Sequence, residues 1–224
     1  IYLYIRNESI TMRGPTMMIK RSFPDVRTDL NPQVFFLLDM TASMGVDKPA
    51  TINAFNEYIG GLKANEGTAG FKFSLAVFNS DIGIGLNIDK GTLADVPELN
   101  DGNYVPDGTT PLYDASGLSI DSLEEVQGQV LFIILTDGEE NASQQFDRED
   151  ILKRISNRTE QGCKFVFLGC DIDAMKQSED LGIAAGNSRS YSRAESQEAM
   201  YDVASATVEY SLRSPSDARG FFEE

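Results

Sequence analysis

Hydrophobic runs and amphipathic stretches alternate along most of this chain. Continuous apolar runs occupy residues 34–38 and 130–135, and such runs are typical of strands that are buried on both faces of a parallel sheet. Between residues 48 and 65 the apolar positions recur every three or four residues, which predicts a helix with one buried face. These positions are Ile52, Phe55, Ile59 and Leu62. The alternation of the two patterns predicts an α/β fold.

The rest of the chain continues this pattern. Further strands are predicted at 71–79, 82–88, 163–170 and 188–192, and further helices at 111–126, 147–161, 173–181 and 194–213. The turn at Ser80-Asp81 is short enough to join its two strands as a hairpin at the sheet edge. The predicted fold is therefore Rossmann-like and doubly wound: a mostly parallel sheet flanked by helices, with one antiparallel edge strand.

One domain is expected, over residues 34–214. Residues 1–33 lack a long periodic segment and are interpreted as an N-terminal arm, and residues 215–224 are interpreted as a C-terminal tail. The net charge is −16, although the arm itself contains five basic and three acidic residues, so the acidic excess belongs to the domain. Such a field repels phosphate backbones, and nucleic-acid binding is therefore not expected.

Composition also bears on the cellular setting. No apolar run approaches the ~18 residues of a membrane-spanning helix, so no membrane span is expected. The two cysteines, Cys163 and Cys170, bracket a predicted strand that would hold them ~23 Å apart, far beyond the ~7 Å limit between bridged Cα atoms. No internal disulfide is expected, and a reducing, cytoplasmic location is predicted.

Side chains that carry oxygen follow the ends of the predicted strands. Asp39, Thr41 and Ser43 stand at alternate positions after the first apolar run, Asp137 follows the run at 130–135, and Thr109 lies in a third loop. In a doubly wound sheet such loops gather at the carboxyl edge, where ligands bind. Hard cations prefer oxygen ligands. These five residues therefore predict a site for Mg²⁺, or for Mn²⁺ or Ca²⁺.

At these residues the sequence resembles the von Willebrand factor type A (vWA) domain. The metal-ion-dependent adhesion site (MIDAS) of that family combines D-x-S-x-S, a threonine on a second loop, and an aspartate in a T-D-G-like third loop. The chain has them in the same order, as Asp39-Met40-Thr41-Ala42-Ser43, Thr109 within D-G-T-T-P-L-Y-D-A, and Thr136-Asp137-Gly138. The resemblance covers residues 34–212, and L-G-I-A-A-G-N at 181–187 is similar to stand-alone bacterial and phage members.

The resemblance implies a vWA fold and a role in binding rather than catalysis. In the family, these hydroxyls and carboxylates hold Mg²⁺, and an Asp or Glu of a partner protein completes the shell. With two carboxylates the ion keeps positive charge, which would attract that acidic group. Thr41 replaces the commoner serine but keeps the hydroxyl. The implied function is a bacterial or phage-encoded adhesion or scaffold module, whose partner docks between residues 91–107 and 137–145.

Two other functions stay open. Asp39-x-Thr41 after a buried strand also looks like the nucleophile motif of Mg²⁺-dependent phosphatases of the haloacid-dehalogenase type, with Asp171 and Asp173 as candidate distal acids. That pattern usually has a second aspartate where Thr41 stands. The chain lacks histidine and a Gly-x-x-x-x-Gly-Lys motif, so neither a Ser-His-Asp triad nor a P-loop is present. The third alternative is a structural subunit of a larger, phage-derived assembly.

The neighbours of the candidate ligands have structural interpretations. Thr110 is expected to cap the helix that follows it, which leaves Thr109 for the metal. Glu139 and Glu140 are expected to be solvated, or otherwise to tune the approach of an acidic partner. Asp171 and Asp173 follow another strand end and are interpreted as candidate caps of the helix after it.

Overall fold

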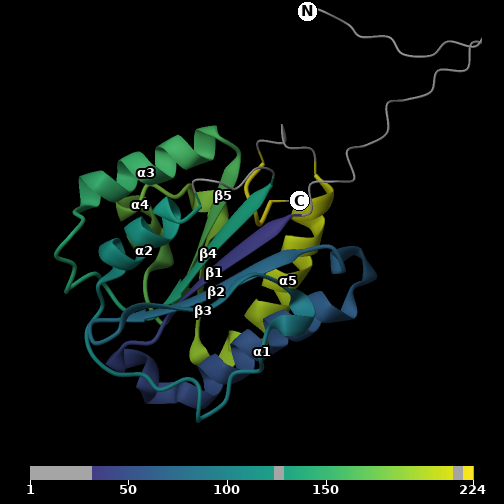
Figure 1. Cartoon of the computed structure of the whole chain (residues 1–224), viewed down its shortest axis with the longest axis horizontal. Coiled ribbons are helices and arrows are strands. Elements are labelled where there is room, and N and C mark those ends of the chain that lie inside the picture. Colours follow the sequence, from purple (N-terminus) through teal and green to yellow (C-terminus); the bar gives the residue numbers. More distant parts are fainter. Residues whose placement is uncertain (1–31, 124–128, 214–218, 224) are drawn as a thin grey trace, which may run out of the picture.

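A sheet of six strands in the order β3-β2-β1-β4-β5-β6 lies at the centre of the computed structural model (Figure 1). The structure describes residues 32–123, 129–213 and 219–223. Its strands are β1 (Gln33–Asp39), β2 (Lys72–Asn79), β3 (Gly83–Thr92), β4 (Val130–Thr136), β5 (Cys163–Cys170) and β6 (Ser188–Tyr191). All neighbouring strands pair in parallel except β3, which is antiparallel to β2. The predicted doubly wound sheet with one antiparallel edge strand is confirmed.

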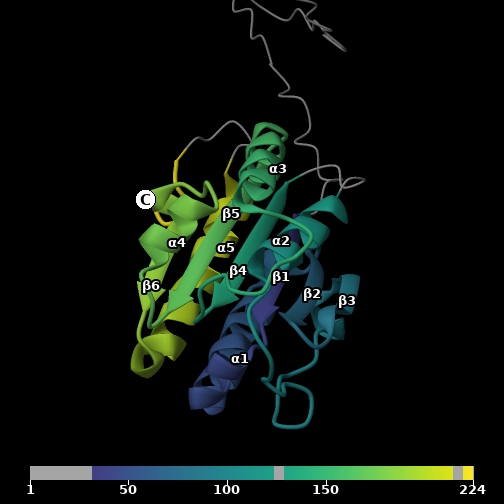
Figure 2. The same ribbon diagram turned by 90° about the vertical axis from the view of Figure 1, so that its left-hand side faces the viewer.

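Helices cover both faces of this sheet (Figures 1 and 2). On one face lie α1 (Lys48–Ala64) and α5 (Ser196–Leu212), and on the other lie α2 (Leu112–Asp121), α3 (Arg148–Glu160) and α4 (Ala174–Asp180). Alternate residues of a strand point to opposite faces. Accordingly, β1 contributes Phe36 and Leu38 to the core beneath α1 and α5, and Phe35 and Leu37 to the core beneath the other three helices.

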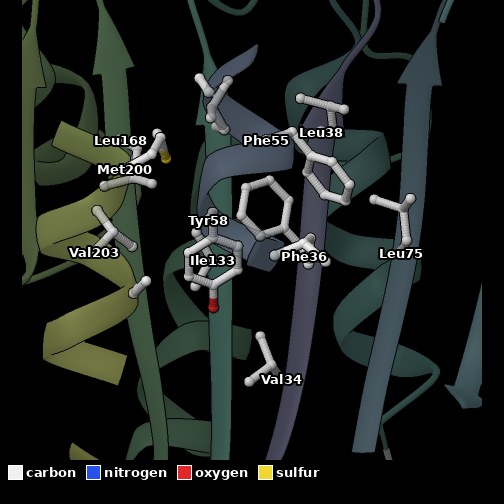
Figure 3. Packing of buried hydrophobic residues seen from close by; sticks show 14 of the residues in the cluster. Val34, Phe36, Leu38, Phe55, Tyr58, Leu75, Ile133, Leu168, Met200 and Val203 are labelled. Carbon is white, nitrogen blue, oxygen red and sulfur yellow. The ribbon is translucent and has the colours of Figure 1, made fainter. Parts of the chain in front are cut away.

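Aromatic rings fix α1 on the sheet. Phe55 and Tyr58 lie over Phe36 of β1, with ring centroids 5.4 and 5.3 Å from that of Phe36 (Figure 3). Met200 of α5 and Leu168 of β5 belong to the same core (Figure 3). Each of these side chains is fully buried, and burial of one such side chain stabilises a protein by roughly 1.5–3 kcal/mol. The helices, and with them the loops at the strand ends, are thereby held in place.

Two elements differ from their predicted extent by more than two residues. β3 was expected over 82–88 but continues to Thr92, because its polar residues still pair with β2 as far as Lys72. α2 was expected over 111–126 and instead ends at Asp121. The last three residues of that prediction lie outside the described part of the chain.

The start of α2 also differs. Pro111, with φ −84° and ψ 63°, precedes the helix as its N-cap residue instead of occupying the first helical position. The N-cap residue is thus Pro111 and not Thr110, so the expected cap is wrong. The free N–H groups of the first turn bind two side chains of a distant loop: Tyr113 donates to Glu140 at 2.8 Å and Asp114 to Ser143 at 3.0 Å.

β3 is an irregular edge strand. Its register with β2 shifts twice, on either side of Leu75, and Lys90 adopts a positive φ of 50°. The backbone N–H of Lys90 donates to the hydroxyl of Ser74 at 3.0 Å instead of to a carbonyl of β2. Bulges of this kind increase the local twist of a strand.

The chain ends bear on the predicted arm and tail. Residues 1–31 of the arm lie outside the described residues, and Gln33 opens β1. In the tail, the backbone N–H of Phe221 donates to Asn187 at 2.7 Å, and its ring, 1% exposed, lies 6.1 Å from that of Tyr210. Residues 219–223 therefore pack on the domain.

Within the described residues, no helix has the length and apolar character needed to cross a membrane. Both cysteines are free.

Candidate metal centre

The candidate ligands lie where the strand order reverses. After β1 the chain forms β2 on one side of it and later forms β4 on its other side. The connections that leave β1 and β4 therefore diverge, and this switch point at the carboxyl ends of the strands is where open α/β sheets bind ligands. Asp39 is the last residue of β1, and Asp137 directly follows β4.

Asp39 is fully buried and is held at both carboxylate oxygens. Its Oδ1 accepts the backbone N–H of Thr41 at 2.7 Å, and its Oδ2 accepts the hydroxyl of Thr136 at 2.5 Å. The hydroxyl of Tyr104 donates to the Asp39 carbonyl at 2.7 Å. The carboxylate is therefore fixed between the ends of β1 and β4.

A chain of polar contacts continues from this carboxylate. Thr41 Oγ1 lies 3.1 Å from Ser43 Oγ, and Ser43 Oγ donates to Asp137 Oδ1 at 2.6 Å. Four of the five predicted site residues thus come together although Asp137 is 94 residues from Ser43 in the sequence.

The fifth predicted residue, Thr109, is exposed. Its backbone pairs with Ser80: the Thr109 N–H donates to the Ser80 hydroxyl at 2.9 Å, and its carbonyl accepts the Ser80 N–H at 3.0 Å. Thr110 is instead 3% exposed, and its backbone pairs with Asn141 on the third loop at 2.9 and 3.1 Å. The structure therefore ties Thr110, rather than Thr109, to the loop that carries Asp137.

The position of Gly138 places the Thr110 hydroxyl at the site. A Cβ atom added at Gly138 would lie 3.1 Å from Thr110 Oγ1 and 3.6 Å from Ser43 Oγ. Both hydroxyl oxygens therefore lie close to the Cα of Gly138, and the absence of a side chain at Gly138 leaves room for them. Any side chain at this position would press on the Thr110 hydroxyl.

Acidic side chains brace the third loop. Glu140 is half-buried and accepts hydrogen bonds from the N–H groups of Tyr113, Ala142 and Ser143 and from the Ser143 hydroxyl, at 2.7–2.9 Å. Its charge lies at the N-terminus of α2, where the helix dipole favours an anion. The expectation that Glu140 is solvated is therefore wrong, because its carboxylate accepts hydrogen bonds from these N–H groups instead of from water. Glu139 is exposed, as expected.

Burial raises the pKa of Asp39 to about 6, against the opposing effect of the hydrogen bonds from Thr136 and Thr41. The nearby carboxylate of Asp137 adds to this rise. Among the described residues, no lysine or arginine forms an ion pair with Asp39. At neutral pH the site therefore contains a buried negative charge without a protein cation beside it, which is costly in an apolar interior.

Sequence reasoning missed Arg193. This residue follows β6, and its Nη2 donates to Asp137 Oδ2 at 2.6 Å while Nη1 binds the carboxylate of Asp171. The missed signal was positional, since a residue just after a parallel strand reaches the same carboxyl edge as Asp39. Of the two candidate caps of α4, Asp173 caps the helix through the N–H of Lys176, whereas Asp171 binds Arg193 instead.

The donor set fits a hard divalent cation. Two carboxylates and the hydroxyls of Thr41, Ser43 and Thr110 are oxygen donors, which Mg²⁺, Mn²⁺ and Ca²⁺ prefer. Across the described ranges, no group of three or more His, Cys, Asp or Glu side chains could hold a metal. A bound ion would therefore depend on hydroxyl groups, and it would compensate the buried charge of Asp39.

Solved structures with the same fold include several adhesion and matrix proteins. The chain is similar to the vWF domain of the type V pilus tip protein Mfa5 from Porphyromonas gingivalis (TM-score 0.58, 10% identity, 83% of this chain and 97% of that one). It is similar to the manganese-loaded TRAP protein of Plasmodium vivax (0.53, 18%, 75% and 71%). A third match is mussel byssus proximal thread matrix protein 1 with a zinc-occupied MIDAS motif (0.56, 17%, 80% and 46%). The chain thus spans less than half of the mussel protein.

These comparisons establish the fold. The protein has the doubly wound vWA fold, as the sequence resemblance implied. No protein-family model matches the sequence, and no curated protein matches it. Two of the three similar structures are described with a divalent metal, manganese in one and zinc in the other.

Proposed function

We propose that the protein is a metal-dependent protein-binding module of the adhesion or scaffold type. The observation that carries this proposal is the convergence of Asp39, Thr41, Ser43 and Asp137 around a buried carboxylate that has no protein cation beside it. The similarity to a byssus matrix protein with a zinc-occupied MIDAS motif and to the manganese-loaded TRAP protein supports it.

The proposed ligands are Asp39, Thr41, Ser43 and Asp137, with Thr110 in place of Thr109. The change rests on burial and proximity: Thr110 is buried and its hydroxyl lies close to Gly138, as that of Ser43 does, whereas Thr109 is exposed. Mg²⁺ is the proposed ion, with Mn²⁺ or Ca²⁺ as substitutes. When bound, the ion would supply a positive centre that accepts one more oxygen ligand.

The proposed partner donates an Asp or Glu to that ion. The protein surface is strongly acidic, so an acidic group needs a local cation in order to approach. Apolar contacts are available on the same edge. Val46 and Val105 are 77% and 57% exposed, on two loops that meet where a Cβ at Gly45 would lie 3.7 Å from Pro106. We therefore expect the partner to present its carboxylate next to aliphatic side chains.

The arrangement favours binding over phosphatase chemistry. A haloacid-dehalogenase mechanism would need Asp171 and Asp173 directed at the nucleophile. Asp173 instead caps α4, and Asp171 binds Arg193. The carboxylate of Asp39 is also fully buried, with both oxygens engaged, so it is poorly placed to attack a phosphate ester.

Metal binding is tested by calorimetric titration of Mg²⁺ and Mn²⁺ into the EDTA-treated protein. Thr110→Ala should weaken binding by at least roughly tenfold, as the loss of a group from a metal site typically does. Thr109→Ala is the matched control and should bind as the wild type does. Loss of binding in Thr109→Ala alone would restore the sequence-based assignment, and equal binding in both variants would place the ion elsewhere.

Partner chemistry is tested by selecting a displayed random-peptide library against the protein in Mg²⁺. Selected peptides should share an Asp or Glu, and its replacement by Asn or Gln, or addition of EDTA, should abolish binding. Peptides that bind equally well in EDTA would contradict a carboxylate-to-metal contact.

A further inference from the structure

A single arginine joins the candidate metal centre to the far edge of the sheet. Arg193 binds Asp137 through Nη2 and Asp171 through Nη1, so its guanidinium lies between two carboxylates. The side chain of Asp137 is 2% exposed and that of Arg193 is 24% exposed. This ion pair is therefore partly shielded from solvent, and its charge acts on the site more strongly than an exposed pair would.

The backbone is shaped to hold this arginine. Asp171 has φ 56°, a left-handed conformation that is uncommon for residues other than glycine, asparagine and aspartate. In this conformation its N–H donates to the Tyr191 carbonyl at 2.9 Å, and its Oδ1 accepts the N–H of Arg193 at 3.2 Å. The backbone and side chain of Arg193 thus both bind one carboxylate, which fixes the guanidinium toward Asp137.

Both carboxylate oxygens of Asp137 are consequently engaged. Oδ1 accepts the Ser43 hydroxyl at 2.6 Å, and Oδ2 accepts Arg193 at 2.6 Å. The Ser43 hydroxyl hydrogen points to Asp137, so Thr41 is the donor in its contact with Ser43, and one lone pair of Ser43 is left for an ion. The guanidinium meanwhile cancels part of the negative charge that would attract that ion.

We propose that Arg193 is a positioning residue that holds Asp137 and sets the charge of the metal centre. Its positive charge lowers the affinity of the centre for a divalent ion, and it leaves the ion-loaded centre more positive toward an acidic partner. The proposal rests on the proposed metal-binding function. Repulsion between a divalent ion and a unit charge across one carboxylate corresponds to roughly tenfold in affinity at the dielectric constant of water. Asp171 offsets part of that repulsion.

The test compares two variants whose charge changes are opposite. Arg193→Gln removes a positive charge and should bind Mn²⁺ roughly tenfold more tightly than the wild type, and Asp171→Asn removes a negative charge and should bind it several-fold more weakly. Asparagine tolerates the left-handed backbone, so Asp171→Asn should fold. Both effects should shrink at high ionic strength.

Matched controls come from a second ion pair on the same segment. Arg189 and Asp202 pair at 2.7 Å without contacting the candidate ligands, so Arg189→Gln and Asp202→Asn make the same charge changes away from the site. Both controls should bind Mn²⁺ as the wild type does. Changes in these controls as large as those in the paired variants would overturn the proposal, since net charge alone would then explain the effect.

The titrations separate this proposal from the proposed function. Tighter binding in Arg193→Gln with weaker binding in Asp171→Asn supports the charge-setting role. Weaker or equal binding in Arg193→Gln overturns that role and leaves the metal site intact. Mn²⁺ binding in Arg193→Gln but not in the wild type supports the charge-setting role in its strongest form, in which the guanidinium excludes the ion. Absence of binding in the wild type and in both variants overturns both proposals.

Discussion

Replacing Asp39 by asparagine should stabilise the metal-free protein while it abolishes metal binding. The carboxylate is fully buried, and burial raises its pKa from 3.8 to about 6. A shift of about two pKa units corresponds to roughly 3 kcal/mol. Because folding raises this pKa, the wild type has its full free energy of unfolding below about pH 3.8, where the carboxyl group is protonated in both states. The free energy that corresponds to the shift is lost as the pH rises through about 6.

The asparagine variant removes most of that cost. Its amide oxygen can accept the N–H of Thr41, as Oδ1 does now. Its amide nitrogen would face the Thr136 hydroxyl, which can turn to donate to the Gly138 carbonyl, 3.3 Å away. That bond is longer than the 2.5 Å bond it replaces, so we expect a net stabilisation of about 1–2 kcal/mol near pH 7.5, below the full value.

Urea denaturation in EDTA measures this difference. The wild type should lose stability relative to the variant as the pH rises from about 3.8 to about 6, and the two curves should converge in acid. Saturating Mg²⁺ should stabilise only the wild type, by about 2.7 kcal/mol at a hundredfold excess over Kd. A variant that is less stable than the wild type in EDTA near neutral pH would refute the argument, since it would mean that the ionised carboxylate is well solvated or paired.

Three further outcomes are expected. The affinity for Mn²⁺ should fall roughly tenfold per pH unit below about pH 6, because the proton competes for Asp39, and a flat calorimetric profile would contradict its role as ligand. Glu140→Gln should lower the free energy of unfolding by about 1.5–3 kcal/mol because Glu140 accepts four hydrogen bonds, whereas the exposed Glu139→Gln should change it little. A Cβ atom added at Gly60 would have no neighbouring atom within 4 Å, so Gly60→Ala should raise the melting temperature, with a helix-propensity gain of up to about 1 kcal/mol. Gly61→Ala should not, since its Cβ would lie 2.9 Å from a side-chain carbon of α5.

The sheet could be predicted because its signals are local. The runs 34–38 in β1 and 130–135 in β4 are apolar at every position, as is typical of strands that are buried on both faces. The N-terminus of α2 could not be predicted in the same way. Thr110 and Pro111 have the right chemistry for a cap, but Glu140, 27 residues from Tyr113, takes the N–H that a cap would bind. Tertiary contacts decide between such competing partners.

The same distinction applies to the site. The spacing of Asp39, Thr41 and Ser43, together with Asp137 after a second buried strand, predicted a cluster that the structure brings together. The choice between Thr109 and Thr110 depended on which of them faces Gly138, and sequence spacing carries no such information. For Arg193, the position after a predicted strand indicates only the edge of the sheet, because its contact with Asp137 depends on the left-handed backbone of Asp171 and on the pairing of β6 with β5.

The irregular β3 governs how this protein behaves toward copies of itself. An edge strand of ten residues offers unpaired backbone groups on which another chain could add, the first step of sheet-to-sheet aggregation. Two register shifts and the left-handed Lys90 break that row into short pieces that face different directions. On the opposite edge β6 has only four residues. Within the described part of the chain, neither border therefore offers a long, regular row of backbone groups on which an intermolecular sheet could grow.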